Sequence, residues 1–532
     1  MKKWPSCITF EKTFFVRFTT CKECKSMSDD IQKVYDELVD RVKKAGLIIS
    51  AGAVLGWDER TYMPRGGVAH RADQMSLLSG LAHEHFTDPK IGEMLARLED
   101  SELTKDPLSP EAVNIRELRR DYDKQTKLPK QLVEDISRTT TMAQGIWVEA
   151  KQKSDFNKFK EILGKVIDLR FKQAEAYGYE TEPYDALMDD YEPGMTIAEV
   201  SKVFAGLRDD LVPFIEKIKN SEKKPDLSLV ENDYDVHRQA YFGKAAAAAI
   251  GFDFTKGRLD VTEHPFCTGI GNGDVRILTH YNPKHFNAAF FGTLHEAGHG
   301  IYEQGLPRDK YAGLPMGESI SLGIHESQSR MWENMVGRGL PFWKHFFPRA
   351  QQVFPERLAG VKLEEFYFAI NDVRPSMIRI EADEVTYNLH ILLRFEIEQA
   401  IFHNDIKLDD IPQVWNEKFE SYFGIQPKND SEGCLQDVHW SMGIFGYFPT
   451  YALGNLYAAQ FFAKAQEEMP NLTSQFEMGD FSSLKKWVNE KIHDHGKRYS
   501  ASDLVEEVTG KPLSHKPLME YLEKKFGPLY FK

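Results

Sequence analysis

The sequence predicts a mainly α-helical protein that carries one small β-hairpin or sheet. Ser109 followed by Pro110 places a cap and then a proline at the first helical position, and Thr196 with Glu199 forms a capping-box pattern. We find no internal repeat and no linker rich in Gly, Ser or Pro, so one large domain over 28–532 is expected. Apolar residues recur at helical spacing along the body, beginning with Ile31, Val34, Tyr35, Leu38, Val39 and Val42.

The predicted elements follow this pattern in order. Long helices are expected over about 130–178, 381–403 and 438–468, and another helix over about 318–337. The exception is 260–282, where β-branched residues surround a Gly-Asn-Gly turn and predict a short hairpin or small sheet. Either a structural flap or a substrate-facing element fits this position.

Composition excludes several classes of protein. The 532 residues include 67 Lys plus Arg and 81 Asp plus Glu, so the net charge is 67 − 81 = −14, which disfavours nucleic acid as a partner. No stretch approaches the roughly 18 apolar residues of a membrane span. Five cysteines are too few for a disulfide framework, so we expect a soluble protein of a reducing compartment.

Residues 1–27 differ from the body and are expected to form a basic leader. Positions 1–26 carry six basic and two acidic side chains. This composition fits an organellar transit peptide or an inert leader, so we expect a cytoplasmic protein with an organellar destination as the alternative. Cys21-x-x-Cys24 has no second Cys pair at finger spacing, which favours no metal or redox role for it.

The motif that carries chemistry is His295-Glu296-Ala297-Gly298-His299. On a helix the two His lie one turn apart on one face, so their ring nitrogens can converge on a single metal ion. Glu296 is turned by about 100° from His295 and is placed to serve a water molecule as a base. The pattern is typical of a metal-dependent peptide hydrolase.

A catalytic metal site of this kind needs a third protein ligand. The position six residues after the second His is Gly305, so the longer zincin pattern fails and the ligand must come from another element. Glu318, Glu326 and Glu333 are the candidates in the predicted helix over 318–337. We favour Glu326, which lies near the helix centre in the polar patch of an apolar run.

Several separated motifs are distributed over about 30–530, which leaves out only the leader. The motifs are Gly56-Trp57-Asp58 with Thr61-Tyr62-Met63-Pro64, His264-Pro265-Phe266, Gly273-Asp274-Val275-Arg276-Ile277, the H-E-x-x-H at 295–299, His325-Glu326-Ser327-Gln328-Ser329, Ile378-Arg379-Ile380-Glu381-Ala382-Asp383-Glu384, and Gly433-Cys434-Leu435-Gln436-Asp437-Val438-His439-Trp440. Together they resemble the motifs of the M32 metallocarboxypeptidases, the carboxypeptidase Taq family.

The resemblance implies a gluzincin-type helical metallocarboxypeptidase with a deep groove, usually a homodimer. Such an enzyme removes single residues from peptides with a free C-terminal carboxylate and has broad specificity. The family's ligands map onto His295, His299 and Glu326, and its general base maps onto Glu296. The implied cofactor is one Zn²⁺ per subunit, for which Co²⁺ can substitute.

The remaining motif residues suggest further roles. A guanidinium can bind the terminal carboxylate of a substrate through two charge-assisted hydrogen bonds. We favour Arg379 for this role, with Arg276 and Arg330 as runners-up. The alternative is that Arg379 forms a structural ion pair with neighbouring acids. By similarity to related gluzincin peptidases, His439 with Tyr447 or Tyr451 is expected to stabilise the oxyanion.

Three further expectations concern residues around the site. His264 is either a donor to the substrate or a turn residue. Gln436 and Asp437 are expected to accept hydrogen bonds from the ligating His. Trp57 and Asp58 are assigned to the scaffold or groove wall.

Two alternatives remain beside the carboxypeptidase. A metallo-oligopeptidase with a similar groove would cut internal bonds and release larger pieces. A non-catalytic helical binding protein would hold a structural metal, but it would have no use for the base Glu296 beside the ligands.

Overall fold

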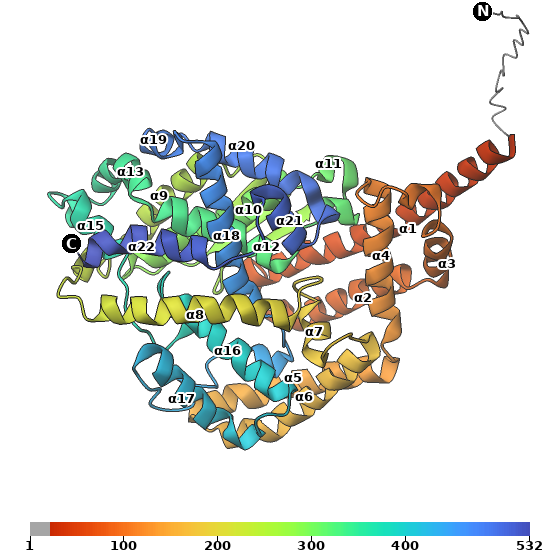
Figure 1. The fold of residues 1–532 in the computed structure, drawn as a ribbon, viewed down its shortest axis with the longest axis horizontal. Helices are drawn as coiled ribbons and strands as arrows, with labels where there is room; N and C mark the ends of the chain where they lie inside the picture. The colour runs from red at the N-terminus through yellow and green to blue at the C-terminus, as the bar shows by residue number, and fades with distance from the viewer. Residues whose placement is uncertain (1–21, 532) are drawn as a thin grey trace, which may run out of the picture.

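The structure is a computed structural model that describes residues 22–531, with side chains from Asp29 onward. Helices make up most of this part of the chain, and three short strands form one small sheet (Figure 1), so the predicted class is confirmed. Residues 1–21 of the expected leader, with Cys21, lie outside the described residues, as does the side chain of Cys24. No helix of 22–531 is long and apolar enough to cross a membrane.

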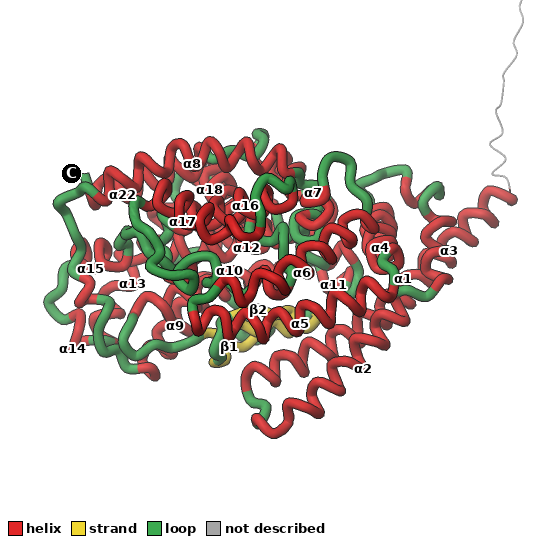
Figure 2. The backbone as a smooth tube through the Cα atoms, turned by 90° about the horizontal axis from the view of Figure 1, so that it is seen from below, coloured by secondary structure: helices red, strands yellow, loops and turns green. Residues whose placement is uncertain are grey.

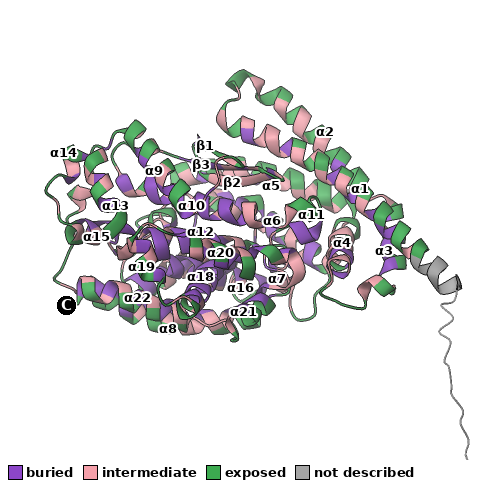
Figure 3. Ribbon diagram, turned by 90° about the horizontal axis from the view of Figure 1, so that it is seen from above, coloured by how far each residue is buried: buried purple, intermediate pink, exposed green. Residues whose placement is uncertain are grey.

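The N-terminal helices form an arm beside the main body. Helix α1 (Lys22–Thr61) packs along α2 (Val68–Phe86), and both run out at one side of the molecule (Figures 2 and 3). Helices α3 (Pro89–Leu98) and α4 (Pro110–Lys127) complete the arm. They enclose a small second core with α1, which includes Leu38, Val42, Ile91, Leu95, Leu98, Ile115 and Leu118.

Both predicted helix starts are confirmed. The Ser109 hydroxyl accepts a backbone N–H at the start of α4. Thr196 and Glu199 form the reciprocal capping box at the start of α8 (Ile197–Lys219). These caps satisfy backbone donors that the first helical turn leaves unpaired.

The long helix expected over 130–178 is wrong, because the structure has two helices there. Helix α5 (Lys130–Lys153) ends at Ser154, whose φ of 52° is left-handed and cannot continue a helix. Asp155 then caps α6 (Phe156–Tyr177) with its carboxylate. The two helices pack against each other as a hairpin.

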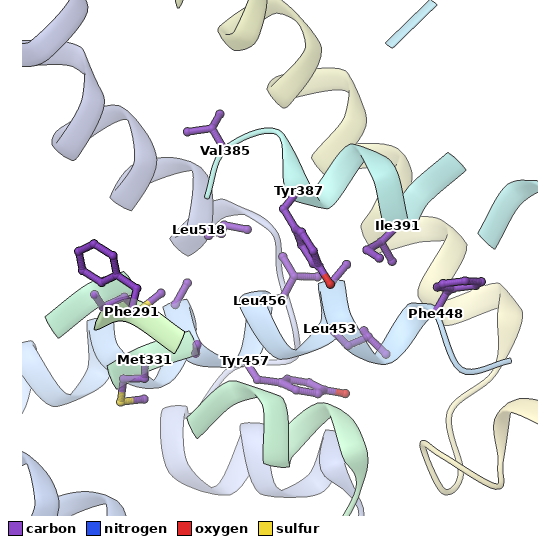
Figure 4. Packing of buried hydrophobic residues seen from close by; sticks show 14 of the residues in the cluster. Phe291, Met331, Val385, Tyr387, Ile391, Phe448, Leu453, Leu456, Tyr457 and Leu518 are labelled. Carbon is purple, nitrogen blue, oxygen red and sulfur yellow. The ribbon is translucent and has the colours of Figure 1, made fainter. Parts of the chain in front are cut away.

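Two other long helices begin later than expected. Before α16 (Tyr387–Phe402), the Asp383 carboxylate accepts backbone N–H groups and forms a turn. Before α18 (Pro449–Glu468), Gly443 and Gly446 adopt positive φ, which interrupts a helix. Figure 4 shows side chains of the two helices packed in the main core, among them Tyr387 and Ile391 of α16 and Leu453, Leu456 and Tyr457 of α18.

The predicted hairpin is present and gains a third strand. Strands β2 (Phe266–Gly271) and β3 (Asp274–Thr279) are antiparallel, and Gly273 takes a φ of 76° in their turn. Strand β1 (Gly257–Val261) pairs with β3 in parallel, so the order is β1-β3-β2. Strands β2 and β3 pack against α10 (Phe286–Gly305), the helix of the H-E-x-x-H motif.

The helix expected over 318–337 is shorter and changes its winding. It begins as α12 (Leu322–Arg330) and widens into a π-helical segment over Met331–Gly337. Such segments are rare and often lie at functional sites.

Helix α12 passes close to α10 on one side and to α18 on the other. A Cβ on Gly298 of α10 would lie 2.7 Å from the Gln328 carbonyl oxygen, and one on Gly454 of α18 would lie 2.5 Å from Glu326 Cγ. Both glycines are therefore required by the packing rather than by a backbone angle. The close approach brings Glu326 next to the H-E-x-x-H motif.

Candidate metal centre

Helix α10 presents the two His and the Glu of the motif as the sequence predicts. The helix is buried on most sides, and His285 caps its start by accepting a backbone N–H. His295 and His299 lie one turn apart, with ring centroids 4.8 Å from each other. Glu296 between them is buried.

Helix α12 supplies the third ligand, and it is Glu326. Its Oε2 lies 3.6 Å from His295 Nε2 and 3.4 Å from His299 Nε2, and the three ligand atoms lie within 4.8 Å of one another. Glu318 instead pairs with Lys497. His295, His299 and Glu326 form a metal-binding group.

The three residues fit a divalent metal ion. Two ligand atoms that are each about 2.0–2.1 Å from a tetrahedral ion lie about 3.4 Å apart, close to the separations from Glu326. Two imidazole nitrogens and one carboxylate oxygen are the donor set of a catalytic zinc site. Beside the group, Glu296 Oε2 is buried without a hydrogen-bond partner among the described residues.

The remaining ring nitrogens of the two His are held by other groups. His295 Nδ1 lies 3.0 Å from Glu333 Oε2, and His299 Nδ1 lies 3.1 Å from the His325 carbonyl oxygen. Such contacts orient ligating imidazoles so that Nε2 faces the metal. Glu333, one of the candidate ligands, therefore contacts the ring nitrogen of His295 that faces away from the metal position. It lies in the π-helical segment.

The expectation that Gln436 and Asp437 orient the ligating His is wrong. Asp437 pairs with Arg379 and Arg394, and Gln436 accepts the backbone N–H of Arg379. Gln436 and Asp437 lie in the loop before His439, and their partners come from the short turn at Arg379–Glu381 and from α16, which sequence spacing alone does not reveal.

Burial and neighbouring charges shift the pKa values of the carboxylates in and beside the group. Burial raises the pKa of Glu296 to about 7, although His295 opposes the shift. Burial also favours the neutral form of Glu326, but Arg330 and His295 outweigh it and hold the Glu326 pKa well below its ordinary value. The Arg330 guanidinium donates to Glu326 Oε1 at 2.6 Å. Glu326 is thus ionised and ready to bind a cation.

Arg379 lies in a buried cluster that connects to the metal-binding group. Its Nε and one terminal nitrogen donate to Asp437 Oδ1 at 3.0 and 2.8 Å, and the other terminal nitrogen donates to the Tyr387 hydroxyl at 3.1 Å. Its ion-pair partner is thus Asp437 rather than one of the neighbouring acids in the sequence. The Tyr387 ring also stacks on Arg330, with the guanidinium carbon 4.5 Å from the ring centroid.

The structure brings His439, Tyr447 and Tyr451 into the same cluster. Ring centroids lie 5.6 Å apart for His439 and Tyr447, and 5.2 Å apart for Tyr447 and Tyr451. Arg379 lies 5.2 Å from the Tyr451 ring centroid. Burial lowers the pKa of His439 to about 4, so its imidazole is neutral at pH 7.

Arg276 and His264 lie on the sheet side of α10. Arg276 pairs with Asp274 at 2.8 Å and stacks on Trp57, with 4.2 Å from its guanidinium carbon to the ring centroid. His264 and Trp57 line a cavity of about 1760 Å³. In the described part of the chain, its walls come from α1, α2, α4, β2 and the segments 262–265 and 308–318, and the metal-binding group is not among them.

Sequence reasoning missed the supporting residues. The sequence shows His325 only as part of a motif, and nothing in it distinguishes Tyr387. Their roles depend on contacts between elements, such as that of Tyr387 with both Arg330 and Arg379. Arg330, a runner-up for the terminal carboxylate in the sequence, pairs instead with Glu326 and Glu333.

A mainly helical fold in which an H-E-x-x-H helix is joined by a Glu from a second helix defines a metallopeptidase of the gluzincin type. The sequence pattern of the carboxypeptidase Taq (M32) metallopeptidases matches residues 37–526. The chain belongs to this family and is a metallocarboxypeptidase.

Known proteins match this chain in sequence and in structure over nearly its whole length. Thermostable carboxypeptidase 1 of Thermus thermophilus is 46% identical over 511 residues, covering 94% of this chain and 99% of that protein. The crystal structure of the M32 carboxypeptidase from Deinococcus radiodurans is 37% identical with a TM-score of 0.90, covering 94% and 99%. Metallocarboxypeptidase 1 of Trypanosoma cruzi is 33% identical with a TM-score of 0.88, covering 94% and 100%.

Proposed function

We propose that the protein is a zinc carboxypeptidase that releases single residues, with broad specificity, from peptides with a free C-terminal carboxylate. One observation carries this proposal. Glu296 Oε2, which is buried and has no hydrogen-bond partner in the described part of the chain, lies beside the His295, His299 and Glu326 group. A structural metal site has no use for a base at that position.

His295, His299 and Glu326 would hold the metal. A bound zinc ion supplies a Lewis acid that polarises the scissile carbonyl and lowers the pKa of water. Glu296 accepts the proton of the attacking water and later delivers it to the leaving amine.

Arg379 is proposed to bind the terminal carboxylate of the substrate. Asp437 is shared by the two guanidinium groups of Arg379 and Arg394, so this buried cluster carries an excess positive charge. A carboxylate of the substrate would neutralise that charge with charge-assisted hydrogen bonds. Arg330 is less suited, because Glu326 and Glu333 already pair with it.

His439 with Tyr447 or Tyr451 is proposed to stabilise the oxyanion. Both Tyr rings lie in the Arg379 cluster, and a buried hydroxyl is a strong donor to a developing negative charge. His264 and Arg276 are proposed to contact the substrate at the sheet side, where His264 lines the cavity.

The remaining proposals concern assembly and location. We propose one Zn²⁺ per subunit, replaceable by Co²⁺, in a homodimer formed by a helical domain over 28–532. The net charge of −14 supports a protein without nucleic-acid partners. We propose a cytoplasmic location, with an organelle as the alternative if 1–27 act as a leader.

The test compares one peptide as the free acid and as the C-terminal amide. Losing charge-assisted hydrogen bonds of about 1.5–3 kcal/mol each predicts a drop in kcat/KM of about 10- to 100-fold or more for the amide. Mass spectrometry should show release of single residues. Equal cleavage of both peptides, or release of larger pieces, would instead identify an oligopeptidase.

A further inference from the structure

A chain of polar contacts extends from His299 to the wall of the cavity. His299 Nδ1 lies 2.5 Å from His325 Nδ1, and His325 Nε2 lies 2.9 Å from Glu303 Oε1. Glu303 Oε2 lies 2.6 Å from a terminal nitrogen of Arg308, which lines the cavity. Glu303 lies one turn after His299 on α10 and belongs to none of the motifs that the sequence singled out.

The short contact between the two imidazoles restricts where their protons lie. Two ring nitrogens at this distance share a single proton, because two N–H groups would repel each other. If His299 Nε2 binds a metal, its proton is on Nδ1 and His325 Nδ1 accepts it. A neutral His325 then carries its own proton on Nε2, which faces Glu303.

We infer that Glu303 is a positioning residue that selects the tautomer of His325 and thereby orients His299 toward the metal. Glu303 accepts the Nε2–H of His325, which leaves His325 Nδ1 as an acceptor for His299. The Arg308 guanidinium pairs with the other oxygen of the Glu303 carboxylate, and Arg308 Nε donates to the Gly317 carbonyl oxygen at 3.0 Å. This inference rests on the metal site of the proposed function.

Strand β2 encloses the carboxylate. A Cβ on Gly269 would lie 2.1 Å from Glu303 Oε2 and 2.6 Å from a terminal nitrogen of Arg308. The strand therefore passes directly over the ion pair, and a larger residue at this position would have to displace it. The side chains of Glu303, Arg308 and His325 are all largely buried, so water does not easily replace a lost partner.

A second acceptor for His299 limits how far the loss of the Glu303 carboxylate can weaken metal binding. His299 Nδ1 also lies 3.1 Å from the His325 carbonyl oxygen, which keeps part of the orientation when His325 changes tautomer. Loss of a partner behind a metal ligand usually weakens metal binding by about 10- to 100-fold. We therefore expect the loss of the Glu303 carboxylate to weaken metal binding by about 10-fold, the lower end of that range.

The experiment measures Zn²⁺ affinity by competition with a chelator in four full-length proteins. They are the wild type, Glu303→Gln, Arg308→Met and the double variant. In Glu303→Gln the single amide oxygen turns to the charged Arg308, so the amide NH₂ faces His325. The His325 Nε2 must then accept a hydrogen bond, which places the proton of the His325 ring on Nδ1. In the double variant that competition is gone, and the amide oxygen is free to accept from His325.

We expect Glu303→Gln to bind Zn²⁺ about 10-fold more weakly, Arg308→Met to bind like the wild type, and the double variant to recover most of the loss. Glu318→Gln, which changes an acid next to Gly317, is the matched control and should leave the affinity unchanged. Wild-type affinity of Glu303→Gln, or a double variant no better than Glu303→Gln, overturns the inference.

A second measurement needs no variant of Glu303. Nitrogen NMR of protein labelled at His, assigned with His325→Gln, reports the tautomer of His325 in the native enzyme. The Nε2-protonated form is expected, and the Nδ1-protonated form overturns the inference. If the wild type binds no metal, the proposed function fails instead.

Discussion

Gly298→Ala should disturb the metal centre without changing any ligand. The added Cβ would lie 2.7 Å from the Gln328 carbonyl oxygen and 2.7 Å from Ser329 Cα, both backbone atoms of α12. Ordinary contacts of a Cβ begin near 3.4 Å. Helix α12 must therefore move by about 0.7 Å relative to α10, because backbone in a packed core cannot yield locally.

This movement opens the metal-binding group, since His295 and His299 lie on α10 and Glu326 lies on α12. The separation of 3.4 Å between His299 Nε2 and Glu326 Oε2 would increase. A misplacement approaching 1 Å costs about 10²-fold in rate, and overpacking of a core costs about 1–3 kcal/mol of stability. We expect kcat/KM to fall by about 10²-fold, with weaker Zn²⁺ binding.

Peptidase kinetics, Zn²⁺ competition and urea denaturation test this prediction. Gly145→Ala is the matched control, because Gly145 lies within the exposed face of α5 and nothing is within 4 Å of its added Cβ. The control should keep full activity and gain about 0.5–1 kcal/mol of stability. A Gly298→Ala enzyme with wild-type kinetics and metal affinity would refute the argument that this contact sets the ligand geometry.

Three further predictions follow from the site and the core. Glu296→Gln should lower kcat by about 10²–10⁴-fold while metal content stays at the wild-type level; full peptidase activity would contradict its role as base. Chelation should lower the Tm, and added Zn²⁺ at 1,000 times its Kd should restore about 4 kcal/mol of stability; a Tm independent of metal would argue against the site. Burial raises the pKa of Glu192 to about 7, so the folded state binds its proton more tightly than the unfolded state, and stability falls as pH rises from about 4.5 through 7. Glu192→Gln should reduce this slope by up to about 1.4 kcal/mol per pH unit in urea denaturation at several pH values, whereas equal slopes would show that Glu192 does not titrate there.

Several features followed from local sequence. The spacing of His295 and His299 places both rings on one face of any helix, so their proximity needed no tertiary information. The caps at Ser109 and Thr196 and the turn before β3 involve residues within three or four positions of each other. Such contacts depend on backbone geometry that the residues themselves favour.

Tertiary structure decided how the pieces of the site meet. Three acids in one predicted helix were candidate ligands, and the close passage of α12 at Gly298 and Gly454 selected Glu326. The π-helical segment placed Glu333 behind His295, and an ion pair between distant segments took Asp437 away from its expected partner. These outcomes depend on how whole helices pack, because side chains that are dozens of residues apart meet only when buried surfaces fit together.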